Sequence, residues 1–456
     1  MKEIYMDFKN KYVLILGLAR SGSAAAIKLS NLGAHVTISD IKPRETFENT
    51  DVLESKGIKL VFEGHPLTLL DNCDLLVLSP GIPSDIEIVT EAKKRNIPVI
   101  SELELGYRFA ASPIIAITGT NGKTTTTTLI GEILKNDGKR VAVAGNIGTP
   151  LVSEVEKTLE NDYLVVEVSS FQLENILYFK PKISIILNIT EDHLNRHKTF
   201  ENYVNIKARI FENQTEEDYT ILNYDDAVVR ELARYAKSDV WFFSRKDVVR
   251  HGACIENDMI VIKNKGKTYP IAKVDEIGIK GSHNLENALA AACSTYLANS
   301  KVSSIAKTLK SFRGIEHRLE FVAEINGIKF INDSKATNPD AAQKAIEAVD
   351  GPIILIAGGY DKKSDYTDFV KSFDGKVKKL ILIGETADAI ENAAIKQGFL
   401  NVEKVNSLKE AVMCGYRAAS CEDTVLLSPA CASWDMFANF EERGRLFKEA
   451  VNSLKK

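Results

Sequence analysis

The stretch IIAITGTNGKTTTTT, residues 114–128, is the strongest local signal in this sequence. Residues 114–117 are apolar and largely β-branched, which is typical of a buried strand. Residues 119–122 (Gly-Thr-Asn-Gly) predict a tight turn, and Lys123 opens a helical pattern that continues through Leu134. A strand, a glycine turn, a lysine and a hydroxyl at a helix start together predict a cradle for phosphate groups.

The chemistry of this turn suits an anion. Glycines let backbone N–H groups approach a phosphate without an intervening Cβ, and a helix N-terminus adds partial positive charge. Lys123 can reach the terminal phosphates of a nucleotide, and the Thr124 hydroxyl can ligate Mg²⁺. The loop is shorter than the usual G-x-x-x-x-G-K-[ST] pattern. A glycine turn with a solvated lysine is the alternative, which the joint occurrence of strand, turn, Lys-Thr and helix disfavours.

Length and composition bound the class of protein. At 456 residues the chain is too long for one core, so two to four domains are expected. The net charge of −4 gives no reason to expect nucleic acid as a partner. The cysteines lack C-x-x-C spacing, and no signal peptide or membrane-length apolar run is visible. These features predict a cytoplasmic protein with free thiols.

The first part of the chain has the outline of a dinucleotide-binding fold. Strand patterns at residues 12–16 and 35–39 flank a glycine turn at 17–22 and an Ala-rich helix, and Asp40 follows the second strand. Ala19 occupies the place of the middle glycine that lets a pyrophosphate approach. We therefore expect a nucleotide-type ligand near Asp40, without assigning NAD. A Rossmann-like domain with a repurposed crevice is the alternative.

Polar residues follow the strands predicted in the second part of the chain. Asn146, Glu167 and residues 188–193 each follow an apolar run, and carboxyl ends of parallel strands share one sheet edge. These residues are therefore expected near Lys123. Glu167 suits a Mg²⁺ ligand, and a helix cap is equally compatible with its spacing. His193 by itself is more often a cap than a ligand.

Two further stretches of the second part are less specific. Residues 241–270 predict a β-hairpin region, and a helix begins near residue 282. Asn287, three residues after Asn284, suits recognition of a base, with helix capping as the alternative. Lys207 lies in a helical pattern and, from that pattern alone, is a solvated lysine.

The third part begins near Gly314 and again alternates strands with helices. Polar clusters follow its strands at residues 332–338, 358–363 and 428–433. Lysines and hydroxyls on one sheet edge suit an anionic substrate, although any single loop lysine is often only solvated. Cys431 is expected to be a small buried residue, since no base is spaced to partner it.

Several stretches together resemble the Mur ligases, ATP-dependent amide-forming enzymes of peptidoglycan synthesis. These are GTNGKTTTT (119–127), EVSSFQLE (167–174), HNLENALAA (283–291) and GIEHRLE (314–320). NDSKATN (332–338) and LSPACASWDMFANFEERG (427–444) are most similar to members that add D-glutamate to UDP-N-acetylmuramoyl-L-alanine. The resemblance spans essentially the whole chain.

The resemblance implies three α/β domains, with a Rossmann-like domain at each end. A UDP-substrate domain would occupy residues 1–110, a P-loop ATPase-type domain 111–313, and an amino-acid-binding domain 314–456. It also implies an acyl-phosphate mechanism with ATP and two Mg²⁺ sites, in a monomer.

The resemblance implies roles for individual residues. ATP would contact Gly119, Thr120, Asn121, Gly122, Lys123, Thr124, Thr125, Asn287, Arg318 and Asp333. The metal ligands would be Thr124, Glu167, His193 and Lys207, with Lys207 carbamylated, and Lys123, His193, Lys207 and Asn146 would serve catalysis.

The resemblance also implies two substrate sites. The uracil and diphosphate would contact Arg20, Ser21, Asp40 and Lys42, where Ile41 and Lys42 depart from one common form of the motif. The D-glutamate pocket would be built from Lys335, Thr337, Lys362, Ser433 and Phe440. Lys363 follows Lys362, so either lysine suits that position.

Other readings of the sequence compete with this one. Another amino-acid ligase, such as a different Mur ligase or a folylpolyglutamate synthetase, shares the phosphate cradle; a folate ligase would not need the Rossmann-like segment. A nicotinamide-dependent oxidoreductase is disfavoured by Ala19. A non-catalytic P-loop switch would leave the clusters at Asn332 and Ser433 without a purpose.

Overall fold

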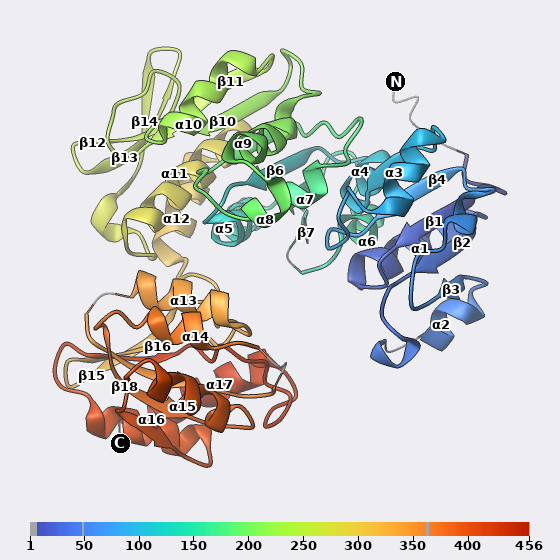
Figure 1. Ribbon diagram of the computed structural model, residues 1–456. Helices are drawn as coiled ribbons and strands as arrows, with labels where there is room; N and C mark the ends of the chain where they lie inside the picture. Colours follow the sequence, from blue (N-terminus) through green and yellow to red (C-terminus); the bar gives the residue numbers. More distant parts are fainter. Residues whose placement is uncertain (1–6, 48–49, 147, 350, 362–363, 456) are drawn as a thin grey trace. The chain divides into compact units, whose positions relative to one another are not determined.

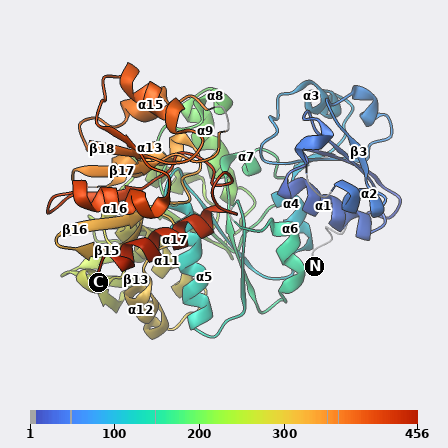
Figure 2. The same cartoon turned by 90° about the horizontal axis from the view of Figure 1, so that it is seen from below.

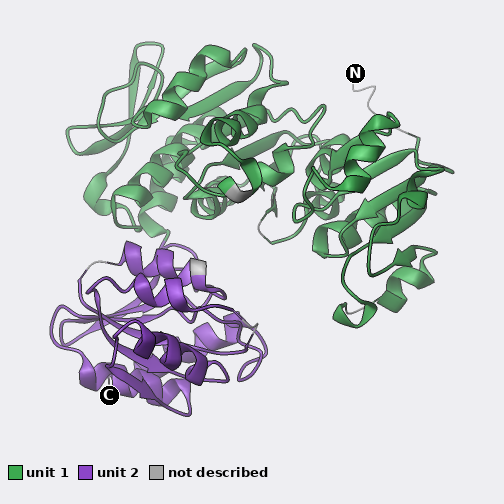
Figure 3. Ribbon diagram, viewed as in Figure 1, with its two compact units in different colours: residues 1–312 green, residues 313–456 purple. Residues whose placement is uncertain are grey.

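The structure, a computed structural model, describes residues 7–47, 50–146, 148–349, 351–361 and 364–455. The chain divides into two compact units, residues 1–312 and 313–456, and each is described by itself (Figure 3). The first unit contains two sheets and the second contains one (Figure 1). These sheets confirm the predicted three-domain α/β fold class. The domain bounds at residues 110 and 313 stay a prediction.

The first sheet is parallel throughout and has the strand order β3-β2-β1-β4-β5. Its strands are β1 (Tyr12–Leu16), β2 (His35–Ser39), β3 (Lys59–Val61), β4 (Leu75–Leu78) and β5 (Val99–Ser101). The helices around it are α1 (Arg20–Asn31), α2 (Thr50–Ser55), α3 (Glu87–Lys94) and α4 (Glu102–Phe109). The order reverses at β1, so the turn after β1 opens at the switch point where α/β sheets bind ligands.

The second sheet has nine strands in the order β14-β13-β12-β11-β10-β9-β6-β8-β7. They are β6 (Ile114–Thr118), β7 (Val141–Gly145), β8 (Tyr163–Glu167), β9 (Ile183–Ile186), β10 (Tyr219–Asn223), β11 (Asp239–Ser244), β12 (Gly252–Glu256), β13 (Met259–Asn264) and β14 (Lys267–Lys273). The hairpin prediction for residues 241–270 is right for β12 to β14, which pair antiparallel. It is wrong for β11, which extends the parallel part of the sheet by pairing with β10 and β12.

Helices cover both faces of this sheet. They are α5 (Lys123–Asn136), α6 (Leu151–Glu154), α7 (Ser170–Leu173), α8 (Leu194–His197), α9 (Phe200–Ala208), α10 (Ala227–Glu231), α11 (Ser282–Leu297) and α12 (Val302–Ser311). Side chains of β6 alternate between two cores: Ile115 and Ile117 pack with α5 and α11, while Ile114 and Ala116 pack on the opposite face. Figures 1 and 2 both place α5 beside α12.

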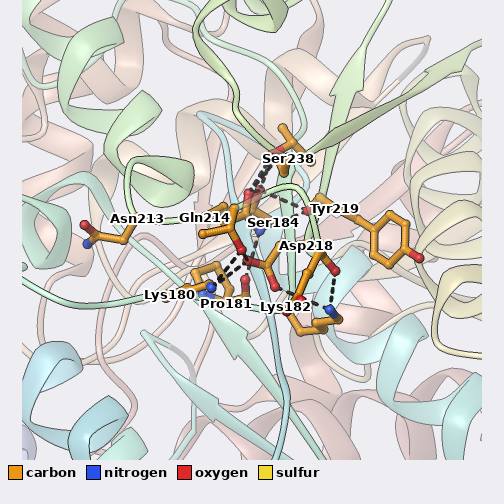
Figure 4. Close-up of polar contacts among 12 residues, drawn as sticks. Lys180, Pro181, Lys182, Ser184, Asn213, Gln214, Asp218, Tyr219 and Ser238 are labelled. Atoms are coloured by element: carbon orange, nitrogen blue, oxygen red, sulfur yellow. Dashed lines mark hydrogen bonds and ion pairs between the residues drawn. The ribbon is translucent and has the colours of Figure 1, made fainter. Parts of the chain in front are cut away.

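A buried polar network lies at the amino ends of β9, β10 and β11, opposite the sheet edge that carries the phosphate cradle (Figure 4). The Gln214 amide nitrogen donates to the carbonyl oxygens of Pro181 (2.9 Å) and Tyr219 (3.0 Å). Its amide oxygen accepts from the hydroxyls of Ser184 (3.0 Å) and Ser238 (3.2 Å). Because these buried groups are hydrogen-bonded to one another, the network holds adjacent strands without leaving polar atoms unsatisfied.

The second unit is a six-stranded sheet in the order β15-β16-β20-β17-β18-β19. Its strands are β15 (Glu320–Ile325), β16 (Ile328–Asn332), β17 (Ile353–Ala357), β18 (Val377–Leu382), β19 (Val402–Lys404) and β20 (Thr424–Leu427). Its helices are α13 (Pro339–Ala348), α14 (Thr367–Lys371), α15 (Ala387–Lys396), α16 (Leu408–Ala418) and α17 (Phe440–Ser453). Only β15, absent from the prediction, runs antiparallel. The clusters predicted after β16, β17 and β20 therefore share one sheet edge.

Candidate active site

The strand, glycine turn and helix of the predicted phosphate cradle form at the predicted residues. β6 ends at Thr118, and α5 begins at Lys123 with Gly122 as its N-cap residue. Gly122 has a φ of +83°, a conformation that L side chains rarely adopt. A Cβ at Gly122 would lie 2.3 Å from Oδ1 of Asn287, so a side chain at Gly122 would require the Asn287 side chain to move.

Asn188, two residues after the end of β9, is hydrogen-bonded to the cradle. Its Oδ1 accepts a hydrogen bond from the Asn121 N–H (2.8 Å), and its Nδ2 donates to the Asn121 carbonyl oxygen (3.1 Å). The Thr120 N–H donates to the Asn188 carbonyl oxygen (2.9 Å). Sequence analysis placed residues 188–193 at this edge without selecting Asn188; its position directly after an apolar strand is the signal that could have found it.

Two lysines converge inside the cradle. Lys123 Nζ donates to the carbonyl oxygens of Gly119 (2.9 Å) and Thr120 (2.8 Å), and Lys207 Nζ donates to that of Gly119 (2.8 Å). Lys207 is 1% exposed, which corrects the pattern-based reading of it as a solvated lysine. Burial, reinforced by the nearby Lys123, lowers the pKa of Lys207 well below its usual value. The helical pattern could not show this burial because it arises from packing of α9 against the cradle.

Glu167 and Asn146 lie beside the cradle at the ends of β8 and β7. Glu167 pairs in register with Ile117 of β6, and its Oε1 accepts from Asn146 Nδ2 (2.8 Å). Its Oε2 is buried and has no hydrogen-bond partner among the described residues. The helix-cap alternative is wrong for Glu167, since Ser169 caps α7. A buried carboxylate oxygen of this kind fits a divalent cation, and Thr124, also buried, supplies a hydroxyl from the first turn of α5.

His193 begins the short helix α8 and has a φ of +53°. Its imidazole is about half exposed, with Nε2 3.6 Å from Oδ2 of Asp192. The imidazole makes no capping hydrogen bond, so the cap alternative is not supported. Among the described residues no three His, Cys, Asp or Glu side chains cluster as a metal site. The predicted metal ligands include Thr124 and Lys207, which are not residue types of such a cluster.

Asn287 lies in the first turns of α11 and is 4% exposed. Its Oδ1 accepts from the Thr126 hydroxyl (3.2 Å), and its Nδ2 donates to Oδ1 of Asn284 (3.3 Å). Gly281, not an asparagine, is the N-cap residue of α11, so the capping alternative is wrong for both asparagines. The structure thus brings Asn287 to the phosphate cradle, whereas Thr125 is half-buried in α5.

In the first sheet, Asp40 ties the β1 turn to the end of β2. Its Oδ2 accepts from the Leu18 N–H (2.8 Å) and its Oδ1 from the Lys42 N–H (3.0 Å). Arg20 is exposed and donates to the Gly148 carbonyl oxygen (3.2 Å). Ser21 is half-buried and the Lys42 side chain is exposed. These residues meet at one sheet edge, and the Asp40 carboxylate already accepts bonds from the backbone.

In the second unit, Asp333 follows β16 and is buried, accepting from the Ser428 hydroxyl (2.8 Å) and the Leu319 N–H (3.2 Å). Burial raises the pKa of Asp333 to about 7. Arg318 beside it is exposed. Lys335 Nζ lies 5.9 Å from the centre of the Phe440 ring.

Ser433 is buried and Thr337 half-buried in the same unit, on the loops that follow β20 and β16. Lys362, predicted in the D-glutamate pocket, lies outside the described residues.

Comparison with known proteins covers each part of the chain. Residues 117–295 match the Mur ligase middle domain, 317–431 the Mur ligase glutamate ligase domain, and 11–101 the MurD-like N-terminal domain of Mur ligases. The chain is 54% identical over 454 residues to a UDP-N-acetylmuramoylalanine–D-glutamate ligase from Thermoanaerobacter pseudethanolicus, covering 99% of this chain and 100% of that one. The chain belongs to the Mur ligase family.

Further comparisons give members of the same family. A UDP-N-acetylmuramoylalanine–D-glutamate ligase from Alkaliphilus metalliredigens is 49% identical over 99% of this chain and 100% of its own. Among solved structures, the MurF ligase from Thermotoga maritima in complex with ADP is 17% identical, with a TM-score of 0.55 and full coverage of both chains. The structural likeness supports the fold alone. Mur ligases use ATP and Mg²⁺.

Arg443, which sequence analysis did not select, organises the glutamate-ligase unit of this Mur ligase. Its guanidinium is fully buried and donates to Ser334 Oγ (3.0 Å), the Ser334 carbonyl (2.8 Å) and the carbonyls of Cys431 (3.1 Å) and Ala432 (3.2 Å). It therefore joins the loop after β16 to the loop after β20. The arginine lies in FEERG, within one of the quoted stretches, but its local pattern resembles a solvated helix face.

Two cavities accompany these sites in the first unit. The larger, about 410 Å³, is lined by residues 248–251, 263 and 266–268 and shares no residue with the predicted site. The smaller, about 310 Å³, has Glu174, Arg196 and His197 in its lining. Neither cavity's lining includes Lys123, Lys207 or Glu167. Within the described ranges, no helix is both long and apolar enough to cross a bilayer.

Proposed function

We propose that this chain adds D-glutamate to UDP-N-acetylmuramoyl-L-alanine at the expense of ATP, in the synthesis of peptidoglycan precursors. The full-length identity of 54% to a ligase named for this reaction carries the assignment. The N-terminal segment, matched by a MurD-like domain, favours it over a folylpolyglutamate synthetase and over other Mur ligases. Ala19 disfavours a nicotinamide enzyme.

The chemistry explains why the cradle is cationic. The substrate carboxylate attacks the γ-phosphorus of ATP, the bond to the bridging oxygen breaks, and ADP leaves behind an acyl phosphate. The amine of D-glutamate then attacks the acyl carbon, and the tetrahedral intermediate expels phosphate as the nitrogen loses its proton. Both reactants of the first step are anionic, so Lys123 and the N–H groups of the cradle must offset their repulsion.

Mg²⁺ would supply further positive charge between these anions when bound. Thr124 and Glu167 would hold one ion, and His193 and Lys207 a second. The buried, unpartnered Oε2 of Glu167 supports the first assignment. Asn146, which donates to the other oxygen of Glu167, would keep that carboxylate oriented beside the substrate.

Carbamylation of Lys207 fits its surroundings. A neutral amine can form a bond to the carbon of CO₂ and release a proton, which converts a cation into a carboxylate-like oxygen ligand. The lowered pKa of Lys207 favours that neutral amine. The carbamate would also remove the repulsion between Lys207 and Lys123 at the Gly119 carbonyl.

The remaining assignments concern the residues that would bind ATP, the UDP group and D-glutamate. Residues of the cradle, 119–125, and Asn287 would hold ATP, joined by Arg318 and Asp333 of the second unit. Arg20, Ser21, Asp40 and Lys42 would hold the UDP group. The D-glutamate carboxylates would contact Lys335, Thr337, Lys362, Ser433 and Phe440. We also propose a cytoplasmic monomer, in keeping with six free cysteines.

The decisive experiment measures phosphate release from ATP by the full chain. With UDP-N-acetylmuramoyl-L-alanine present, D-glutamate should support turnover, whereas L-glutamate, L-alanine, L-lysine and meso-diaminopimelate should not. Release that needs a different amino acid would redirect the assignment to another Mur ligase. Absence of coupled phosphate release with every amino acid would reject a ligase.

A further inference from the structure

Several contacts join the two sheets of the first unit, among them the bonds of Glu102 and Glu104 to the second sheet's segments. Another set is made by the loop of residues 79–85, directly after β4, and one end of this loop packs on the turn that follows β1. The Ser79 hydroxyl donates to the Gly17 carbonyl oxygen (2.9 Å). A Cβ at Gly17 would lie 2.9 Å from Cβ of Ser79, so the turn and the Ser79 side chain pack closely. The proposed UDP residues Arg20 and Ser21 open the helix that follows this turn.

The other end of the loop is fastened to the second sheet's helices by Glu174 and Arg196. The Ser84 hydroxyl donates to Glu174 Oε2 (2.5 Å), and Arg196 Nη2 donates to the Ile82 carbonyl oxygen (3.0 Å). Arg196 also donates two hydrogen bonds to the Glu174 carboxylate, from Nε to Oε1 (3.1 Å) and from Nη2 to Oε2 (2.7 Å). A bidentate pair fixes orientation as well as distance.

Ser84, Glu174 and Arg196 form a latch whose hydrogen bonds are partly buried. The side chains of Glu174 and Arg196 are 10% and 15% exposed. Asn175 adds two bonds between the sheets, from its Nδ2 to Ser84 Oγ (2.9 Å) and from the Ser101 N–H to its own carbonyl oxygen (2.8 Å). Such charge-assisted, half-buried bonds hold a loop far more firmly than an exposed ion pair does.

Arg196 belongs to α8, the short helix that starts immediately after His193. The structure therefore contains a path from the turn after β1 to the segment that carries His193. It consists of the hydrogen bonds of Ser79, Ser84 and Glu174 and of the loop 79–85 that joins them. Resting on the proposed function, this path joins the place of the UDP group to the place of the reacting carboxylate.

We propose that Glu174 is a positioning residue that sets the distance between the two ends of the UDP-sugar-peptide site. A substrate that spans both ends gains affinity only when the ends are held at the right separation, whereas a ligand that occupies one end is indifferent to it. Glu174 would thus act on the whole substrate through Ser84 and Arg196, without touching the reacting atoms.

The test compares a ligand that needs one end with a ligand that needs both. Binding of UDP and of UDP-N-acetylmuramoyl-L-alanine to the full chain is measured by calorimetry for the wild type, Glu174→Gln and Ser84→Ala. We expect Glu174→Gln to weaken the full substrate about tenfold or more relative to UDP, since a charged bidentate pair is lost. The KM for ATP should change little.

Glu256→Gln is the matched control, because it removes another ion pair of the same unit, with Lys263, that has no contact with Ser84, Glu174 or Arg196. It should leave the ratio of the two affinities unchanged. Ser84→Ala should reproduce part of the effect and add little in the Glu174→Gln background, as expected for one network. Equal losses of both ligands, or an unchanged ratio, would overturn the proposal. Failure of the wild type to use D-glutamate would instead reject the proposed function.

Discussion

Lys123 and Lys207 donate to the same acceptor, the carbonyl oxygen of Gly119, at 2.9 and 2.8 Å. Two ammonium groups at one carbonyl repel each other, and Lys207 has almost no water to relieve that repulsion. We expect the two lysines to have different roles. Lys123, at the start of α5, would contact phosphate, whereas burial lowers the pKa of Lys207.

Replacing Lys207 by alanine should abolish turnover, because the proposed metal ligand is lost. Short carboxylic acids such as acetate should restore part of the activity by entering the space and supplying the missing oxygen. Lys207→Arg keeps the positive charge but cannot be carbamylated, and it should show no rescue. Phosphate release with and without carboxylate measures this; full activity in Lys207→Ala would remove the carbamate from the mechanism.

Lys123→Ala should eliminate turnover, by a factor of about 10³ or more, while the fold stays intact. The reason is that Lys123, the first residue of α5, is the side chain proposed to contact the terminal phosphates of ATP. Lys135→Ala, an exposed lysine at the far end of the same helix, is the control and should keep wild-type rates. Circular dichroism and phosphate release together check the prediction, and appreciable turnover in Lys123→Ala contradicts it.

Gly122→Ala should weaken ATP binding much more than it destabilises the protein. The new Cβ would lie 2.3 Å from Asn287 Oδ1, in addition to the cost of about 1 kcal/mol for a left-handed L residue. Gly138→Ala is matched in strain, since its φ is +81°, but nothing lies within 4 Å of its Cβ. The KM for ATP should therefore rise in Gly122→Ala alone. Equal KM values in the two variants would contradict this.

The sequence predicted the parts of the fold that depend on local pattern. β1 and β2 have the predicted bounds because each is a buried apolar run bounded by turn residues. β3, β15 and β19 escaped prediction: β3 and β19 are short, all three lie at sheet edges, and pairing rather than composition defines them. Strands with few apolar residues produce little periodicity from which to predict them.

The candidate site likewise contains residues that local sequence predicts and residues that depend on contacts distant in sequence. Lys123 and Thr124 are visible because the cradle is contiguous in sequence. Lys207 could be assigned only through family resemblance, since its burial depends on a contact with a loop 88 residues away. Arg443 and Glu174 were missed because their partners lie on distant loops, and charged residues in helical patterns ordinarily face solvent.

Arg443→Met should weaken the use of D-glutamate. It leaves the carbonyls of Ser334 and Cys431 without the Arg443 guanidinium as donor, which costs about 3 kcal/mol or more. Because the two loops it joins carry Lys335 and Ser433, the KM for D-glutamate should rise while ATP binding in the first unit is retained. Arg445→Met, on the exposed face of the same helix, is the control. A KM for D-glutamate equal to that of the wild type would contradict the prediction.

Glu102 gives the chain a pH-dependent stability. It is fully buried, accepts the Val152 N–H (2.8 Å), and its other oxygen has no hydrogen-bond partner among the described residues. Burial raises the pKa of Glu102 to about 7, from an ordinary value of 4.5. The folded chain therefore binds more protons than the unfolded chain between about pH 4.5 and 7, so this carboxyl lowers stability progressively as the pH rises through that window.

Glu102→Gln should remove this dependence, because glutamine keeps an acceptor for Val152 but cannot ionise. The melting temperature of the variant minus that of the wild type should become more positive from pH 5 to pH 8, corresponding to about 3 kcal/mol at most. Glu132→Gln, an exposed carboxylate on α5, should give a constant difference. If the Glu102→Gln difference is equally constant, the carboxyl is ionised throughout and its burial does not control the proton.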